Sequence, residues 1–253
     1  MTPIPFPIER IYLQEQGNGK LRREEQLLAD YLRPFDVPIE TFTEKRMRRR
    51  TLKITANTPV VGDVAMVLAA LKCLDKQPPS PLGYPEVLMP YLHRNLWRAK
   101  LQDVIRQWMN QSCEPVFIKP ADDEKKFTGK RITGLDDLQP LTRHSGQTTL
   151  WCSSRVTWLS EYRAYVVRGC IKSVAFYAGD ADQAIDLAVV AQAVAALGTA
   201  APAGYSLDFG LLDTGQTGLV EANDGYSLGA YDGIDAATYG ELILARWFEL
   251  TTG

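Results

Sequence analysis

The first part of the chain alternates between strand-like and helix-like patterns of apolar residues. Residues 8–15 are typical of a strand, and residues 22–33 place apolar side chains at helical spacing until Pro34. The stretch VVGDVAMVLAALKCL, residues 60–74, predicts a second helix that starts at its Gly-Asp pair. An apolar stripe in residues 95–109 predicts a third, amphipathic helix.

After residue 115 the pattern changes to short strands separated by turns. The predicted elements are strands at 115–120, 130–134, 148–154, 160–169 and 170–179, then an apolar helix at 184–197. Strands interleaved with helices, many of them consecutive antiparallel candidates, predict an α+β fold. We therefore expect an N-terminal region of residues 1–112 and a C-terminal region of residues 113–253.

The stretch LVEANDG, residues 219–225, carries a carboxylate and a carboxamide two positions apart on a predicted strand. Because alternate strand residues point to the same face, Glu221 and Asn223 project together. An earlier strand at 206–212 and a turn containing Thr-Gly lead directly into this one. The sequence therefore predicts a β-hairpin with polar groups on one face.

The register of this hairpin decides whether a third oxygen ligand joins that face. If Leu212 pairs with Thr217, Asp208 lies directly opposite Glu221. Two facing carboxylates repel each other unless positive charge lies between them. Carboxylate and amide oxygens suit a hard cation such as Mg²⁺, so Asp208, Glu221 and Asn223 are candidate metal ligands. The alternative is an exposed polar strand face without a metal.

Composition and charge exclude several classes of protein. The chain has 253 residues, of which 45% are hydrophobic and 23% charged, and its formal net charge of −2 provides no overall positive field for nucleic acid. No segment has the length of a membrane span, and the first residues lack a signal-peptide pattern. The four cysteines contain no C-x-x-C pair, and there are only two histidines, which argues against a zinc site. We expect a cytoplasmic protein with free thiols.

The stretch VFIKPADDEKKFTGKRITG has features of a phosphate-binding loop. Lys119 ends an apolar strand, and Thr128, Gly129 and Lys130 lie in the following turn. Glycine lets backbone amides approach a phosphate, and lysines supply compensating charge. The spacing is not that of a P-loop, and a solvated hairpin loop is the competing interpretation.

Two further basic side chains lie on consecutive predicted strands. Arg163 is on the polar face of SEYRAYVVRG, and Lys172 follows on the next strand, so both are candidates for contacting a phosphate. A cross-strand ion pair is the alternative for the arginine. The basic run at 44–53 is interpreted as a solvated surface rather than a nucleic-acid site.

In their order along the chain, these pieces resemble the ATP-grasp superfamily, in particular its branch with an arginine-to-lysine exchange. The matching stretches are VFIKP, KKFTGK, SEYRAYVVRGCIKSVAFY and VEANDGYSLGAYDG. The resemblance is good over residues 116–233 and looser over 1–115. It implies two α+β subdomains that hold ATP between them, preceded by a smaller N-terminal α/β domain.

The resemblance also implies roles for individual residues. Phosphates of ATP would be bound by Lys119, Thr128, Gly129 and Lys130. The hinge residues Trp151, Cys152 and Ser153 would lie beside adenine and contact it through the backbone, although WCSS offers no acidic side chain for the ribose. Arg163 and Lys172 would act in catalysis, and Mg²⁺ would be held by Asp208, Glu221 and Asn223.

The function expected from the resemblance is an ATP- and Mg²⁺-dependent carboxylate–amine ligase that forms an acyl-phosphate. Its partners would be ATP and small-molecule or peptide substrates that carry a carboxylate and an amine. A phosphotransferase on the same fold and an ATP-binding protein without ligase activity are the alternatives. The chain does not identify the two substrates.

Overall fold

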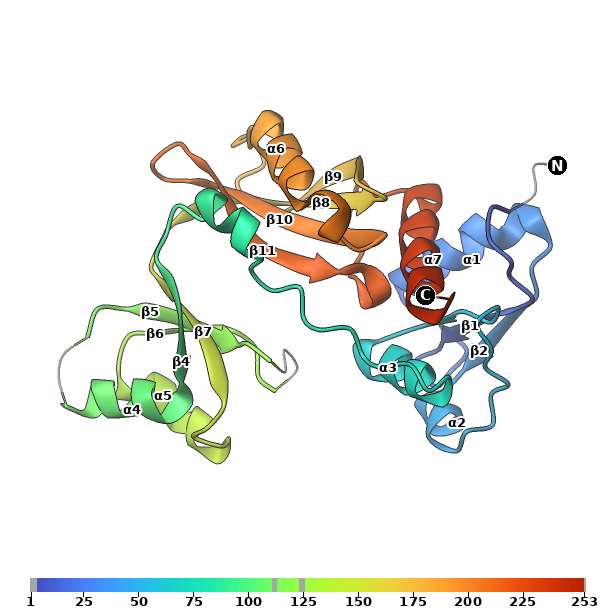
Figure 1. Ribbon diagram of the computed structural model, residues 1–253, viewed down its shortest axis with the longest axis horizontal. Coiled ribbons are helices and arrows are strands. Elements are labelled where there is room, and N and C mark those ends of the chain that lie inside the picture. Colours follow the sequence, from blue (N-terminus) through green and yellow to red (C-terminus); the bar gives the residue numbers. More distant parts are fainter. Residues whose placement is uncertain (1–3, 111–112, 123–125, 253) are drawn as a thin grey trace.

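The computed structural model describes residues 4–110, 113–122 and 126–252, which form three β-sheets with their covering helices (Figure 1). The N-terminal sheet is parallel, with strand order β2-β1-β3. Its elements are β1 (Ile11–Gln14), α1 (Arg23–Leu32), β2 (Ile39–Phe42), α2 (Glu44–Arg48), β3 (Val60–Val61) and α3 (Val64–Cys73). The Gly-Asp pair does start α3, because the Asp63 carboxylate accepts a hydrogen bond from the Met66 amide.

The middle sheet is antiparallel, with strand order β4-β7-β5-β6. Its elements are β4 (Leu96–Lys100), α4 (Leu101–Asn110), β5 (Val116–Pro120), β6 (Lys130–Ile132), α5 (Leu135–Leu138) and β7 (Thr149–Ser154). Both helices lie on the same side of the sheet (Figure 1). A separate apolar core lies beneath them, with Leu101, Ile118 and Leu150 fully buried.

Two expectations for this region need correction. The predicted helix at 95–109 is a strand over its first part, because pairing of β4 with β7 overrides the helical spacing of residues 96–100. A boundary at residues 112 and 113 would also separate β4 and α4 from the sheet and core that they complete. We propose instead that the division between structural units lies before β4.

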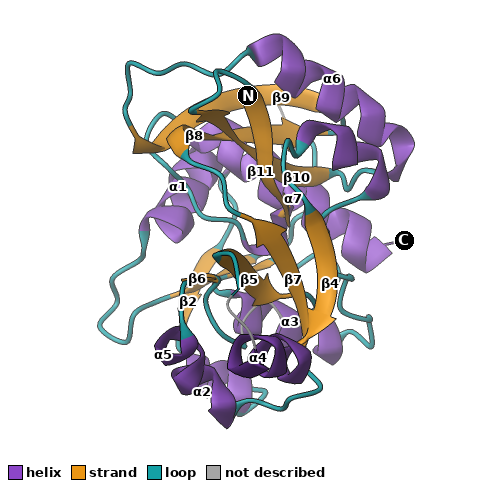
Figure 2. Ribbon diagram, turned by 90° about the vertical axis from the view of Figure 1, so that its left-hand side faces the viewer, coloured by secondary structure: helices purple, strands orange, loops and turns teal. Residues whose placement is uncertain are grey.

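The C-terminal sheet is antiparallel, with strand order β11-β10-β8-β9. Its elements are β8 (Trp158–Val167), β9 (Cys170–Gly179), α6 (Leu187–Leu197), β10 (Gly204–Leu212), β11 (Thr217–Asp224) and α7 (Ala236–Thr252). Alternate residues of β8 enter different cores: Ala164 and Val166 pack with α6, whereas Tyr165 and Val167 pack with α7. The two helices therefore cover opposite faces of this sheet (Figure 2).

The same alternation places the polar groups of the hairpin. Leu207, Phe209 and Ala222 are buried in the core beneath α6. Asp208 and Glu221 consequently point to the other face, on the side of α7 and the N-terminal sheet. The mixed arrangement of parallel and antiparallel sheets with helices confirms the expected α+β class.

The hairpin register differs from the expected one close to the turn. Leu211, rather than Leu212, pairs with Thr217. A β-bulge then shifts the register between Asp208 and Phe209, so Asp208 faces Glu221 as expected. The two expectations were linked by regular pairing, and the bulge separates them.

The N-terminal sheet and the C-terminal sheet share one continuous core. Residues of α1 such as Leu28 and Leu32 pack with Tyr239 and Leu242 of α7. Figure 1 shows α1 beside α7, with the middle sheet attached on the other side of the C-terminal sheet. No helix in the described part of the chain is long and apolar enough to cross a membrane.

A buried ion pair joins the end of β11 to α7. The Arg246 guanidinium donates to both carboxylate oxygens of Asp224, at 2.7 and 2.5 Å, and the side chains of the pair are 10% and 8% exposed. Burial raises the pKa of Asp224 against the opposing effect of Arg246. The charge of Asp224 therefore depends on its partner.

We expect Arg246→Met to lower the free energy of unfolding by about 3–5 kcal/mol, because it leaves Asp224 buried without a cation. Urea denaturation measures the loss. The double variant Arg246→Met/Asp224→Asn removes the stranded charge and should recover most of the stability. A single variant as stable as the double variant would contradict this description of the pair.

Candidate functional site

Two adjoining cavities lie between the middle sheet and the C-terminal sheet. Cavity A has a volume of about 400 Å³, and cavity B has a volume of about 510 Å³. The residues of cavity A used below are Lys119, Thr128, Gly129, Arg163, Glu221 and Asn223. Those of cavity B are Tyr84, Arg94, Phe117, Ser153, Glu161 and Glu221. Glu221 lines both cavities, so the hairpin lies where they meet.

Asp208 and Arg163 form a buried ion pair across β10 and β8. The guanidinium donates from Nε at 2.8 Å and from Nη2 at 2.7 Å to the two carboxylate oxygens. Burial raises the pKa of Asp208 to about 6, although Arg163 opposes this shift. Burial would lower the pKa of Arg163, but the hydrogen bonds and charge of Asp208 outweigh burial and raise it. Asp208 itself does not line cavity A, whereas Arg163 does.

A second ion pair joins the middle sheet to the hairpin. Lys119 Nζ lies 2.8 Å from Glu221 Oε2 and 4.5 Å from the centre of the Tyr84 ring. Burial would lower the pKa of Lys119, but Glu221 outweighs it and raises the pKa. Burial would raise the pKa of Glu221, and Lys119 in turn lowers it. Both groups are therefore held in their charged forms.

The expected repulsion between Asp208 and Glu221 is absent, because each carboxylate already has its own cation. Asn223 shares their face and donates from Nδ2 to Asp208 Oδ2 at 3.3 Å. The hairpin thus brings the three predicted oxygen ligands together. Their donor chemistry fits Mg²⁺, which prefers carboxylate and amide oxygens. Such binding requires Glu221 to turn away from Lys119 and the Asn223 amide to present its oxygen.

The predicted phosphate loop reaches cavity A only in part. Thr128 and Gly129 line the cavity, whereas Lys130 Nζ donates to the Asp137 carbonyl at 2.7 Å and does not line it. A Cβ at Gly129 would lie 2.6 Å from the Phe117 ring and 3.1 Å from Lys119 Cβ. Only glycine therefore fits beside Lys119 without displacing its neighbours.

The hinge residues are placed differently from the expectation. Ser153 lines cavity B, but Trp151 and Cys152 do not. Strand β7 lies between β4 and β5, so the backbone at these two residues faces sheet partners on both edges and is not open to adenine. The Cys152 side chain is in the apolar core, where burial raises its pKa to about 12. Trp151 instead supports the Tyr84 ring, with ring centroids 5.3 Å apart.

Lys172 is not brought to the site. Its Nζ lies 3.1 Å from Glu241 Oε2 on α7, and Lys172 lines neither cavity. A second β-bulge, between Tyr165 and Val166, interrupts the pairing of β8 with β9 at this point. The placement contradicts the expectation that Lys172 and Arg163 face the same phosphate.

Three residues of cavity B were missed by the sequence analysis. Glu161 lies two positions before Arg163 and accepts a hydrogen bond from Tyr177 at 2.8 Å, so an acidic side chain does line this cavity. Arg94 donates to the carbonyls of Leu219 and Val220, at 2.5 and 2.8 Å, beside the β-bulge. Tyr84 is the third. The alternation of β8 signalled Glu161, but nothing local to their own segments signalled Arg94 and Tyr84.

Comparison with known proteins places this site in a family. A protein-family model described as an ATP-grasp domain, the second family of its clade, matches residues 91–242. No curated protein sequence matches the chain.

Several solved structures have the same fold at low sequence identity. D-cycloserine synthetase DcsG is 13% identical over 94% of this chain and 99% of its own, with a TM-score of 0.57. A RimK domain ATP-grasp protein from Sphaerobacter thermophilus is 15% identical over 96% and 100% of the two chains, with a TM-score of 0.54. D-alanine–D-alanine ligase from Bacillus anthracis is 12% identical over 96% and 97%, with a TM-score of 0.53. Because the family match covers more than half of the chain, the protein belongs to the ATP-grasp family.

Proposed function

We propose that this protein is an ATP- and Mg²⁺-dependent ligase that joins a carboxylate to an amine through an acyl-phosphate. The observation that carries the proposal is the paired arrangement of Lys119 with Glu221 and of Arg163 with Asp208 where two cavities meet. Cations for phosphate and oxygen ligands for a metal are thereby held within one small region. The solved ligase from Bacillus anthracis binds ATP, which supports an ATP site on this fold.

Cavity B suits the base and sugar of ATP. Tyr84, Phe117 and Trp158 give it aromatic walls, and Glu161 offers a carboxylate that can accept hydrogen bonds from ribose hydroxyls. Arg155 and Val156 follow β7, and their backbone groups form no hydrogen bond to another described residue. We propose that these two residues, rather than Trp151 and Cys152, contact the adenine edge.

Cavity A suits the phosphates and the reacting carboxylate. Lys119 and the backbone beside Gly129 would hold phosphate oxygens, and Arg163 Nη1 would face the transferred phosphoryl group. When bound through Glu221, Asn223 and Asp208, Mg²⁺ supplies positive charge that offsets the charge of the phosphates.

In the proposed reaction, a carboxylate oxygen of the first substrate attacks the γ-phosphorus, and the bond between that phosphorus and the ADP oxygen breaks. The amine nitrogen of the second substrate then attacks the acyl carbon. A C–N bond forms, the C–O bond to phosphate breaks, and inorganic phosphate leaves. Arg163 stabilises the charge that develops on the phosphoryl oxygens.

The direct test is ATP consumption by the full chain with pooled amino acids and peptides, followed by mass spectrometry of the products. The ligase proposal predicts ADP, inorganic phosphate and a product formed with loss of water. A phosphorylated substrate without free phosphate would identify a phosphotransferase instead. Nucleotide binding without turnover in any pool would favour a binding protein and contradict the proposal.

Lys119→Met should weaken ATP binding by about 1.5–3 kcal/mol, the usual range for a hydrogen bond to a charged group. Isothermal titration calorimetry measures the change. Lys172→Met is the matched control, because it removes a lysine whose partner is Glu241 and which lines neither cavity. Equal ATP affinity of Lys119→Met and the wild-type chain would exclude a phosphate contact by Lys119.

Mg²⁺ with a non-hydrolysable ATP analogue should raise the melting temperature, since a ligand at a hundredfold excess over its dissociation constant stabilises the native state by about 2.7 kcal/mol. Glu221→Gln should lose most of this gain, because it removes a metal ligand. Glu241→Gln, which alters the partner of Lys172 outside the cavities, should keep it. If differential scanning fluorimetry shows the full gain in Glu221→Gln, the metal role of Glu221 is wrong.

A further inference from the structure

A third cavity opens beside cavity A, between the N-terminal sheet and α7. Cavity C has a volume of about 230 Å³ and shares Val64, Ser227, Leu228 and Gly229 with cavity A. At about 30 Å³ for each water molecule, its volume corresponds to seven or eight waters, the size of a small amino acid. Its walls come from the start of α1, the turn before α3, the loop after β11, and α7.

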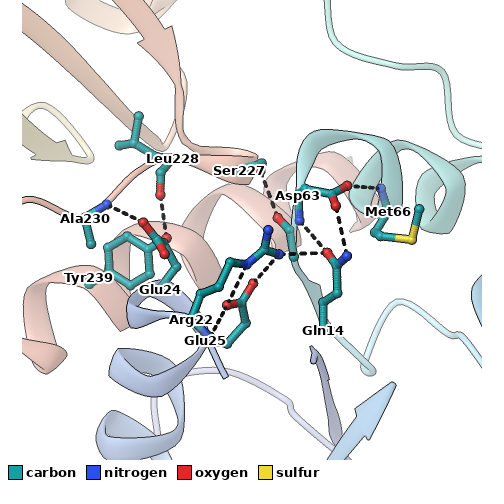
Figure 3. A network of polar contacts seen from close by, with 11 residues as sticks. Gln14, Arg22, Glu24, Glu25, Asp63, Met66, Ser227, Leu228, Ala230 and Tyr239 are labelled. Atoms are coloured by element: carbon teal, nitrogen blue, oxygen red, sulfur yellow. Dashed lines mark hydrogen bonds and ion pairs between the residues drawn. The ribbon is translucent and has the colours of Figure 1, made fainter. Parts of the chain in front are cut away.

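Arg22 is fixed in this cavity but retains an unused donor. Its Nε and Nη2 donate to the buried carboxylate of Glu25 at 3.3 and 2.9 Å, and Nη2 also donates to Gln14 at 2.9 Å. In Figure 3 the remaining nitrogen, Nη1, points away from these partners. Nη1 forms no hydrogen bond within the described residues, and the Arg22 side chain is 37% exposed. A rigidly held guanidinium with a free N–H edge can bind a carboxylate.

Glu24 is fixed in a similar way and retains an unused acceptor. Its Oε1 accepts a hydrogen bond from the Ala230 amide at 3.0 Å, and Oε2 has no partner in the described part of the chain. No cation lies within ion-pair distance of Glu24 among those residues, although its neighbours Arg23 and Glu25 both have ion-pair partners. The carboxylate is therefore held in place with its charge uncompensated, which suits an ammonium group.

The position of Gly229 shows which of the two groups is nearer the proposed chemistry. A Cβ at Gly229 would lie 3.5 Å from Arg163 Nη1 and 3.9 Å from Glu24 Oε1. Glu24 therefore lies close to the arginine of cavity A. Arg22 lies farther from Ala230, between Glu24 and the pair formed by Gln14 and Asp63 (Figure 3).

We propose that cavity C binds the second substrate, and that this substrate is an α-amino acid whose amine contacts Glu24 and whose carboxylate contacts Arg22 Nη1. This inference rests on the proposed ligase function, in which an amine attacks the acyl carbon in cavity A. The amine end lies at Gly229, on the side of Arg163, and the carboxylate end lies between α1 and the turn before α3. Arg22 and Glu24 bind and orient this substrate, and neither contacts ATP.

The test measures binding of amino acids to the full chain by calorimetry without nucleotide. Individual amino acids identified from a pooled thermal-shift screen are compared with their α-amides, which keep the amine but lack the carboxylate, and with the corresponding deaminated acids. The wild-type chain should bind an amino acid at least about tenfold more tightly than either analogue, because each analogue loses a hydrogen bond to a charged group.

Two variants assign the contacts. Glu24→Gln keeps an oxygen for the Ala230 amide but removes the charge, and Arg22→Lys keeps the charge beside Glu25 but removes the guanidinium fork. Each should weaken amino-acid binding about ten- to a hundredfold, with melting temperature and ATP affinity close to wild type. Asp30→Asn is the control, because Asp30 lies on the same helix but outside the cavities and pairs with Arg33.

The outcomes separate this inference from the proposed function. Binding of no amino acid, equal binding of the α-amides, or unchanged binding by both Glu24→Gln and Arg22→Lys would each overturn the assignment of cavity C, even if ATP is bound and consumed. Failure of the wild-type chain to bind ATP would overturn the ligase function, whatever the calorimetry with amino acids shows.

Discussion

Two carboxylates held side by side on one face of the β10–β11 hairpin are the constraint on which the rest of the site depends. Asp208 is buried and Glu221 is half-buried, so each requires a cation. Arg163 supplies one from the adjacent strand, and Lys119 supplies the other from the middle sheet. The second pair therefore crosses between two sheets that have separate cores, and it closes the space in which cavities A and B meet.

This arrangement implies exchange of partners when a nucleotide binds. Without it, the four charges neutralise one another and hold the two sheets together. With Mg²⁺ and ATP bound, the cations can turn to phosphate oxygens and the carboxylates to the metal, so charge remains balanced in both states. The N-terminal unit extends the same region, because Glu24 and Arg23 of the first helix contact the loop of Ala230 to Asp232 beside Arg163.

Much of the fold and part of the site followed from the sequence. The alternation along β8, β10 and β11 was enough to place Arg163, Asp208, Glu221 and Asn223 on one face, because strand periodicity is a local property. The register near the turn was wrong because a β-bulge follows from the packing around Val220, which single-strand periodicity does not report. The final position was still correct, since the bulge compensates for the shift.

Other features depended on contacts between distant segments. Residues 96–100 have helical spacing but form a strand, because the edge of β7 pairs with them. Lys172 was placed by its distance from the turn, but its ion pair with Glu241 of α7 holds it elsewhere. Arg22 and Glu24 are part of an ordinary helix start in the sequence, and only the fold brings them beside Gly229.

A crystal structure of the full chain with Mg²⁺ and a non-hydrolysable ATP analogue is the most direct test of this account. We expect the base in cavity B, Lys119 Nζ on a phosphate oxygen rather than on Glu221, and the metal within about 2.5 Å of Glu221 and Asn223 oxygens. A nucleotide bound elsewhere, or bound here with the Lys119–Glu221 pair intact and no metal on the hairpin, would contradict it.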